Sequence, residues 1–147
     1  MANIVPYSFP VELLKGNHDF VNDTYTISLY TSLAAYTTAS TVFDATGEVS
    51  SGGGSQYAAQ ALTGNAVSNV ANYATVDFTD PVWGSPTPAT FSALGGAIYN
   101  TSDANKLVVI LDFGATFSCS NGTFTVTFPA PTAGTPSGAD ALLSINS

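Results

Sequence analysis

The sequence predicts an all-β fold, namely a single-domain β-sandwich or jelly-roll-like structure with short helical turns near the N-terminus. About seven or eight short segments are rich in β-branched and aromatic residues, several with apolar residues at every second position. Turns rich in Gly, Pro, Asn and Asp separate these segments. No helical pattern is longer than about three turns, so the apolar faces of strands must form the core.

The composition is that of one folded domain. The chain has 147 residues, of which 45% are hydrophobic and only 8% are charged. Globular domains most often have about 100–150 residues, whereas disordered chains are poor in apolar residues and rich in charge. We therefore expect an N-terminal arm or short helix at residues 1–16. A single β-sandwich domain follows at residues 17–147, with a Pro/Gly-rich loop at residues 129–139.

The N-terminal segment carries signals for a short helix, although an extended arm fits the same residues. Pro10 is tolerated in a first helical turn, and Gly16 is a suitable residue just after a helix. Residues 24–31 are β-branched and aromatic, which predicts a strand with Tyr25, Ile27 and Leu29 on one face. Residues 33–36 fit one helical turn.

The rest of the chain alternates between strand and turn patterns. Residues 44–55 are predicted as a loop, and residues 65–72 fit either a strand or a helix. Gly95 and Gly96 mark a β-bulge or a close approach of two backbones. Residues 107–113 form the most continuously apolar run, which predicts the centre of the sheet. The other expected elements are strands at residues 57–63, 74–78, 91–99, 123–128 (aromatic residues and Val126 inward) and 141–145, with turns at residues 100–105 and 118–122.

The charge balance argues against several classes of partner. Ten acidic residues stand against two lysines, Lys15 and Lys106, for a net charge of −8. Nucleic acids and anionic membranes are bound mainly through Lys and Arg, so we expect neither as a partner. The longest aliphatic run, residues 107–111, is too short for a membrane-spanning helix of about 20 residues. The N-terminus lacks a signal-peptide pattern, which predicts a soluble protein without an export signal.

No combination of residues indicates an enzyme. His18 is the only imidazole, and its neighbour Asp19 would point to the opposite side of an extended chain. We interpret His18 as a loop residue with its ring in water. Cys119 lies in a predicted turn with no Lys, Arg or His nearby in sequence, so we expect an inert thiol. Asp112 interrupts an apolar run and is expected to accept backbone or threonine hydrogen bonds at the end of its strand.

Neither a metal ion nor a cofactor is expected. The oxygen-bearing residues of the 17–23 segment lack the ligand spacing of an EF-hand, so a solvated polar turn is preferred over a calcium site. The glycines at residues 52–54 are not followed by the Lys-Ser/Thr pair of a phosphate-binding loop. A single cysteine cannot form an internal disulfide. The calcium alternative would use Asn17, Asp19, Asn22 and Asp23.

Several short motifs follow one another along nearly the whole chain. They are Leu13-Leu14-Lys15-Gly16, the Thr-rich residues 22–32, Glu48-Val49-Ser50, Pro81-Val82-Trp83, Ala97-Ile98-Tyr99, Asp112-Phe113-Gly114 and the strand at residues 121–126. In this order they resemble a family of small tailed-phage virion proteins of the head-decoration, or cement, type. Asp112-Phe113-Gly114 is not a kinase signature, because the other kinase elements are missing.

The resemblance implies a structural protein on the capsid surface of a virion, synthesised in the host cytoplasm. Its implied partners are the major capsid protein and copies of itself, commonly as a homotrimer at threefold positions. A surface with few charges suits this role, since burying unpaired charge at an interface is costly. A tail, connector or fibre component is the second interpretation. A host- or carbohydrate-binding β module is the third, with Tyr57, Tyr73, Trp83 and Tyr99 as candidate aromatic residues.

Two segments are the candidates for contact with neighbouring subunits. Tyr7, Phe9 and Leu13 lie in an N-terminal segment that is short and interrupted by proline, so they are candidates to insert into a neighbour. The alternative is that these residues cover one end of the protein's own sandwich. The Pro-rich loop supplies the other candidates, Pro129, Pro131 and Pro136.

Overall fold

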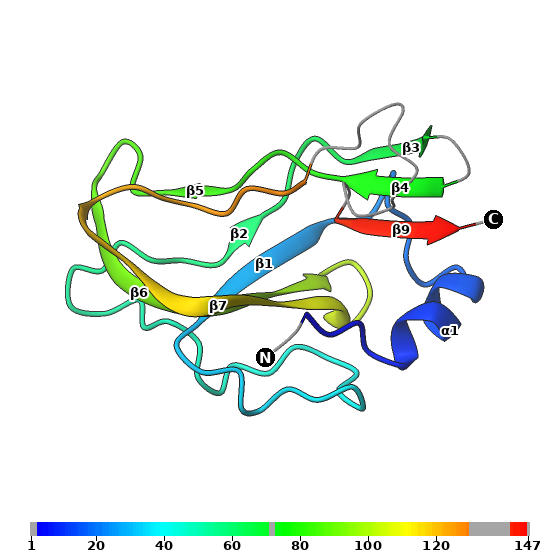
Figure 1. The fold of residues 1–147 in the computed structure, drawn as a ribbon, viewed down its shortest axis with the longest axis horizontal. Helices are drawn as coiled ribbons and strands as arrows, with labels where there is room; N and C mark the ends of the chain where they lie inside the picture. The colour runs from blue at the N-terminus through cyan, green and yellow to red at the C-terminus, as the bar shows by residue number, and fades with distance from the viewer. Residues whose placement is uncertain (1–2, 71–72, 130–141, 147) are drawn as a thin grey trace.

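Strands make up most of the fold, in several antiparallel sheets (Figure 1). The computed structural model describes residues 3–70, 73–129 and 142–146. Within these ranges, no helix is both long and apolar enough to cross a bilayer. The elements are α1 (Ser8–Leu14), β1 (Tyr25–Tyr30), β2 (Gln60–Ala61), β3 (Ala66–Val70), β4 (Tyr73–Asp77), β5 (Val82–Trp83), β6 (Ala89–Asn100), β7 (Lys106–Gly122), β8 (Phe124–Thr125) and β9 (Leu143–Asn146).

A four-stranded sheet in the order β2-β1-β6-β7 forms the centre of the molecule. The alternation predicted for β1 is confirmed, because Tyr25, Ile27 and Leu29 join one apolar cluster. Tyr30 joins a second cluster on the other face of the sheet. All four side chains have 0% exposure. β1 is therefore buried on both faces of the sheet, which fits the absence of charged residues from β1 and from its neighbour β6.

Different parts of the chain cover the two faces. The larger cluster joins the sheet to residues of β5, β8 and the flanking segments, among them Phe78, Trp83 and Phe128. The smaller cluster joins Tyr30 and Leu107 to Leu33 and Tyr36, with Phe43 packed against it. The loop that follows β1 thus covers the second face (Figure 1).

The prediction that residues 107–113 form the centre of the sheet is wrong. β7 lies at the end of the strand order, and β1 and β6 lie inside it. The continuous apolarity has another cause, because both faces of this part of β7 are covered. Its outer edge is also paired locally: the backbones of Ile4 and Ile110 exchange two hydrogen bonds of 2.8 Å, and Val42 forms a bridge with Lys106.

The predicted turn at residues 118–122 is also wrong, because β7 continues to Gly122 and pairs with the first half of β6. Ser92 lies opposite Ser118, and their hydroxyls are 2.7 Å apart, so polar residues that suggested a turn form a cross-strand pair. The irregularity predicted at the glycine pair is confirmed by a register shift between Ala93 and Gly95. A Cβ on Gly95 would overlap the Leu111 carbonyl oxygen.

Within the described residues there are two smaller sheets, with orders β3-β4-β9 and β5-β8. The ambiguous segment at residues 65–72 contains strand β3. The strands predicted at residues 57–63 and 123–128 are shorter than expected, being β2 and β8. The predicted alternation in the latter is nevertheless confirmed, because Phe124, Val126 and Phe128 are buried and the threonines between them are exposed. Most of the loop predicted at residues 129–139 lies outside the described residues.

Candidate functional site

Local sequence signals determine where helix α1 ends, but they do not hold the helix in place. The helix ends in a Schellman motif: Gly16 has φ +76°, its N–H bonds to the Leu13 carbonyl, and the Asn17 N–H bonds to the Glu12 carbonyl. This confirms the predicted short helix ended by Gly16. The first residue of the helix has no side-chain cap. Because isolated helices shorter than about 12 residues are marginal in water, packing must hold this seven-residue helix in place.

The helix has two apolar faces. Phe9 is only 6% exposed and belongs to the large core cluster, with Leu13 packed against that cluster. Tyr7, Val11 and Leu14, spaced four and three residues apart, are 73%, 51% and 90% exposed. Tyr7 is the N-cap residue just before the helix, and we call these three residues the outer face of α1. It contains no carboxylate.

The predicted contact residues are therefore separated by the fold. Phe9 and Leu13 pack on the protein's own core, in agreement with the alternative that they cover one end of the sheet. Tyr7 presents its ring to the surface. Pro129 is exposed and borders a groove of about 660 Å³ between β7 and residues 123–129. Pro131 and Pro136 lie outside the described residues.

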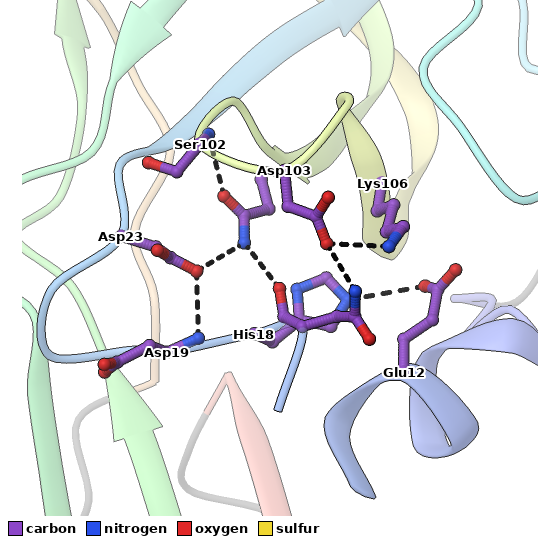
Figure 2. Close-up of polar contacts among 9 residues, drawn as sticks. Glu12, His18, Asp19, Asp23, Ser102, Asp103 and Lys106 are labelled. Atoms are coloured by element: carbon purple, nitrogen blue, oxygen red, sulfur yellow. Dashed lines mark hydrogen bonds and ion pairs between the residues drawn. The ribbon is translucent and has the colours of Figure 1, made fainter. Parts of the chain in front are cut away.

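His18 lies beneath α1, so the interpretation of His18 as a solvated loop residue is wrong. Its side chain has 0% exposure, and its ring packs against Phe9, Phe20 and Tyr25, with ring centroids 5.0, 6.2 and 6.3 Å away. His18 Nε2 lies 3.5 Å from Glu12 Oε2, which is long for a hydrogen bond (Figure 2). Burial lowers the pKa of His18 from its ordinary value of 6.5, although the Glu12 carboxylate acts in the opposite direction.

Unpaired polar atoms gather at this place. Among the described residues, the buried side-chain nitrogen and oxygen atoms without a hydrogen-bond partner all belong to α1 or to residues 18–25. Native interiors leave few such atoms unpaired, and each one costs about 1–3 kcal/mol. We call this group the α1 seat. Its atoms are Ser8 Oγ, Glu12 Oε2, both ring nitrogens of His18 and the Tyr25 hydroxyl.

A well-paired network borders the seat and ties it to the turn between β6 and β7 (Figure 2). Asp103 Oδ2 accepts hydrogen bonds of 2.7 Å from both Asn17 Nδ2 and Lys106 Nζ. These bonds, first that of Lys106 and then that of Asn17, lower the pKa of Asp103. Asn100 Nδ2 donates to Asp23 Oδ2 at 2.7 Å and to the Asn17 carbonyl at 3.1 Å.

The oxygens considered for calcium are engaged by donors of the protein itself. Asp19 Oδ1 accepts bonds from the N–H groups of Val21 and Asn22, and Asp19 Oδ2 accepts one from Asn22 Nδ2. Asp23 Oδ2 accepts the Asp19 N–H and the Asn100 amide. Among the described residues, no three His, Cys, Asp or Glu side chains are grouped so as to hold a metal ion.

The remaining candidates do not form a site together. Cys119 is buried within β7 and not in a turn. Asp112 Oδ1 accepts the Gly114 N–H at 2.8 Å, which confirms the predicted backbone hydrogen bond, but Asp112 lies within β7 and not at the end of its strand as predicted. Of the aromatic residues considered for carbohydrate binding, Tyr57, Trp83 and Tyr99 are 4%, 2% and 6% exposed. They are core residues, so they offer no exposed platform for a sugar.

The outer face of α1 and the seat beneath it could not have been found as a unit from the sequence. Leu13-Leu14 looked like one apolar motif, yet its two side chains point to different environments. No protein-family model, curated protein or solved structure matches this chain.

Proposed function

We propose that this protein is a structural component of a tailed-phage virion, a decoration protein that binds across junctions between capsid subunits. The observation that carries the proposal is the second apolar face of α1. Phe9 and Leu13 anchor the helix to the core, whereas Tyr7, Val11 and Leu14 are exposed and lie outside the core clusters. Exposed apolar side chains grouped on one element mark an interaction surface.

The size of the outer face favours a repeated, multivalent contact. Three side chains offer on the order of 300–400 Å², whereas a stable interface buries about 800 Å² on each partner. A single contact of this size is weak. In an oligomer that meets a lattice at several equivalent positions, weak contacts combine into high avidity, and binding to the mature lattice stabilises it by mass action. A homotrimer on the major capsid protein has this geometry.

The distribution of charge also favours the outer face of α1 as the interaction surface. The chain carries a net charge of −8, so copies repel one another over most orientations. The outer face lacks carboxylates and is followed by Lys15, one of two lysines in the chain. It is therefore a surface through which an acidic protein approaches a neighbour without burying like charges.

We further propose that the sheets form a β-sandwich of the jelly-roll-like kind. One continuous cluster contains residues of β1, β6 and β7 as well as residues of β5 and β8. In Figure 1, β4 and β5 lie to one side of β1, β6 and β7, which belong to one sheet. Two layers around one core are the arrangement that defines a sandwich.

Particle binding by variants of the outer face tests the function. Val11→Ser with Leu14→Ser should weaken binding to particles that lack the protein by about tenfold or more, since burying each apolar side chain contributes about 1 kcal/mol. Val82→Ser is the matched control, because Val82 is 41% exposed on β5 and far from α1 in Figure 1. Occupancy is measured as copies per particle after sedimentation.

The copy number of the natural protein decides between virion roles. Hundreds of copies per particle, lost by the double variant and kept by the control, would support decoration. A few dozen copies or fewer would indicate a tail or connector position. Absence from purified particles would overturn the proposal.

A further inference from the structure

We propose that the buried ring of His18 is a pH-sensitive latch beneath α1: while the ring is neutral, the helix, and with it the outer face, stays closed against the body of the protein, and acidification loosens it. This inference rests on the proposed function only in its consequence, the presentation of the outer face. The latch itself rests on the contacts beneath the helix.

The latch combines two features. The helix α1 is weakly attached to the rest of the protein, and a side chain that changes its charge with pH lies beneath it. α1 has seven residues and no N-terminal side-chain cap, and Phe9 is its one fully buried residue. Beneath it lie the unpaired atoms of the seat, which weaken its attachment. Elements of this kind, with few buried apolar contacts and unsatisfied polar groups, open at low free energy without unfolding the rest.

The groups that face His18 determine the sign of its response. Glu12 on α1 and Asp103 at the β6–β7 turn favour the protonated ring, while Lys106 on β7 opposes it. From β1, Tyr25 contributes a neutral hydroxyl whose pKa is raised by burial. Phe9 and Phe20 contribute apolar rings. Burial outweighs the carboxylates, so the ring is held neutral and its pKa lies below 6.5.

The consequence for docking follows from proton linkage. With the helix open, His18 is in water and regains its ordinary pKa of 6.5, so the open form binds the proton more tightly than the closed form. The closed form is therefore fully favoured above pH 6.5. Its stability relative to the open form decreases as the pH falls below 6.5. The decrease stops once the pH is below the lowered pKa that His18 has in the closed form.

Hydrogen exchange of α1 amides measures this opening directly. Between pH 7.5 and 5, the protection factors of residues 11–16 should fall, about tenfold for each pH unit below 6.5 until the pH reaches the lowered pKa of His18. Amides of β6 serve as the internal control and should keep their protection. Protection of α1 that does not change with pH would overturn the latch. So would an equal loss in α1 and β6, because it would mean global unfolding.

Variants identify the titrating group. His18→Phe places an aromatic ring in an aromatic environment and should abolish the acid-induced loss of protection in α1. The double variant His18→Phe with Glu12→Gln should likewise show α1 protection that does not depend on pH. Glu12→Gln alone should keep the acid-induced loss or enlarge it, because the ring loses a favourable carboxylate. If Glu12→Gln alone removes the loss, His18 is not the group that responds to pH and the latch is overturned. This variant decides the question even if His18→Phe does not fold.

The exchange experiment and the particle experiment fail separately. A pH-dependent opening in a protein absent from particles would leave the latch intact and overturn the proposed function. Full occupancy of particles by a protein whose α1 protection is constant would support decoration and overturn the latch.

Discussion

Two buried polar clusters on opposite faces of the same sheet show contrasting ways of burying polar atoms. On one face, the hydroxyls of Tyr30 and Tyr36 lie 2.8 Å apart, and both lie within 3.0 Å of the Asp44 carbonyl oxygen. The Asp44 N–H donates to the Tyr36 hydroxyl at 3.0 Å. On the other face, the α1 seat buries Ser8 Oγ, Glu12 Oε2, the His18 ring nitrogens and the Tyr25 hydroxyl without a hydrogen-bond partner, and the shortest approach, between His18 Nε2 and Glu12 Oε2, is 3.5 Å.

The difference indicates that the loop after β1 is rigidly attached and that α1 is the part that opens. A fully paired network fixes the loop after β1 onto the sheet, because breaking any bond leaves a buried group unpaired. In the seat, opening the helix lets the unpaired atoms bond to water, so opening recovers free energy. Although both clusters are buried, the loop after β1 is therefore attached strongly to the sheet, and α1 is attached weakly.

The largest expected effect on the free energy of unfolding comes from removing one buried ring on each face of the central sheet. Tyr30→Ala should lower the free energy of unfolding by about 3–5 kcal/mol, since it removes a ring with 0% exposure together with its hydrogen bonds. Phe9→Ala should lower it by only about 1–2 kcal/mol, because the loss is limited to the free energy that docks α1. Urea unfolding followed by tryptophan fluorescence measures both. Equal losses would remove the contrast between the two faces.

Removing single hydroxyls sharpens the comparison. Tyr36→Phe should destabilise the protein by about 1–3 kcal/mol, because the Asp44 N–H loses its acceptor. Tyr25→Phe should leave stability within about 0.5 kcal/mol or increase it, because the hydroxyl has no partner to lose. Melting temperatures of the two variants, each with one oxygen removed, give a matched pair. A clear loss on Tyr25→Phe would show that the seat is paired in solution.

The smallest effect concerns the network that borders the seat. The pKa of Asp103 is lowered in the folded protein, so its contribution is present above pH 3.8 and is lost as the pH falls below that value. Asp103→Asn should lower Tm at pH 7 by about 1 °C and reduce the further decrease between pH 5 and pH 3, since exposed pairs contribute little. Lys106→Gln, which removes the positive charge beside Asp103, should change Tm in the same direction. An unchanged acid profile would exclude a role for this network.

Sequence reasoning found the local features and missed the assembly of the site. Gly16 and Pro10 predicted a short helix, and the alternation at residues 124–128 predicted buried Phe124 and Phe128, because these signals depend only on neighbours in the chain. The burial of His18 was missed, since the polar residues Asn17 and Asp19 on either side of it suggested a solvated turn. The edge position of β7 was missed because an apolar run indicates burial without indicating which strands lie beside it.

The sequence by itself determined that the protein is mainly β, that a short helix ends at Gly16 and that few charges are available for its surface. These properties follow from backbone preferences, side-chain alternation and composition, which are local or additive. Only the tertiary structure decided that Phe9, His18 and Tyr25 share one buried seat while Tyr7, Val11 and Leu14 remain outside. That division depends on which distant segments pack against a single short helix, and contacts of this kind are not encoded in any one stretch of the chain.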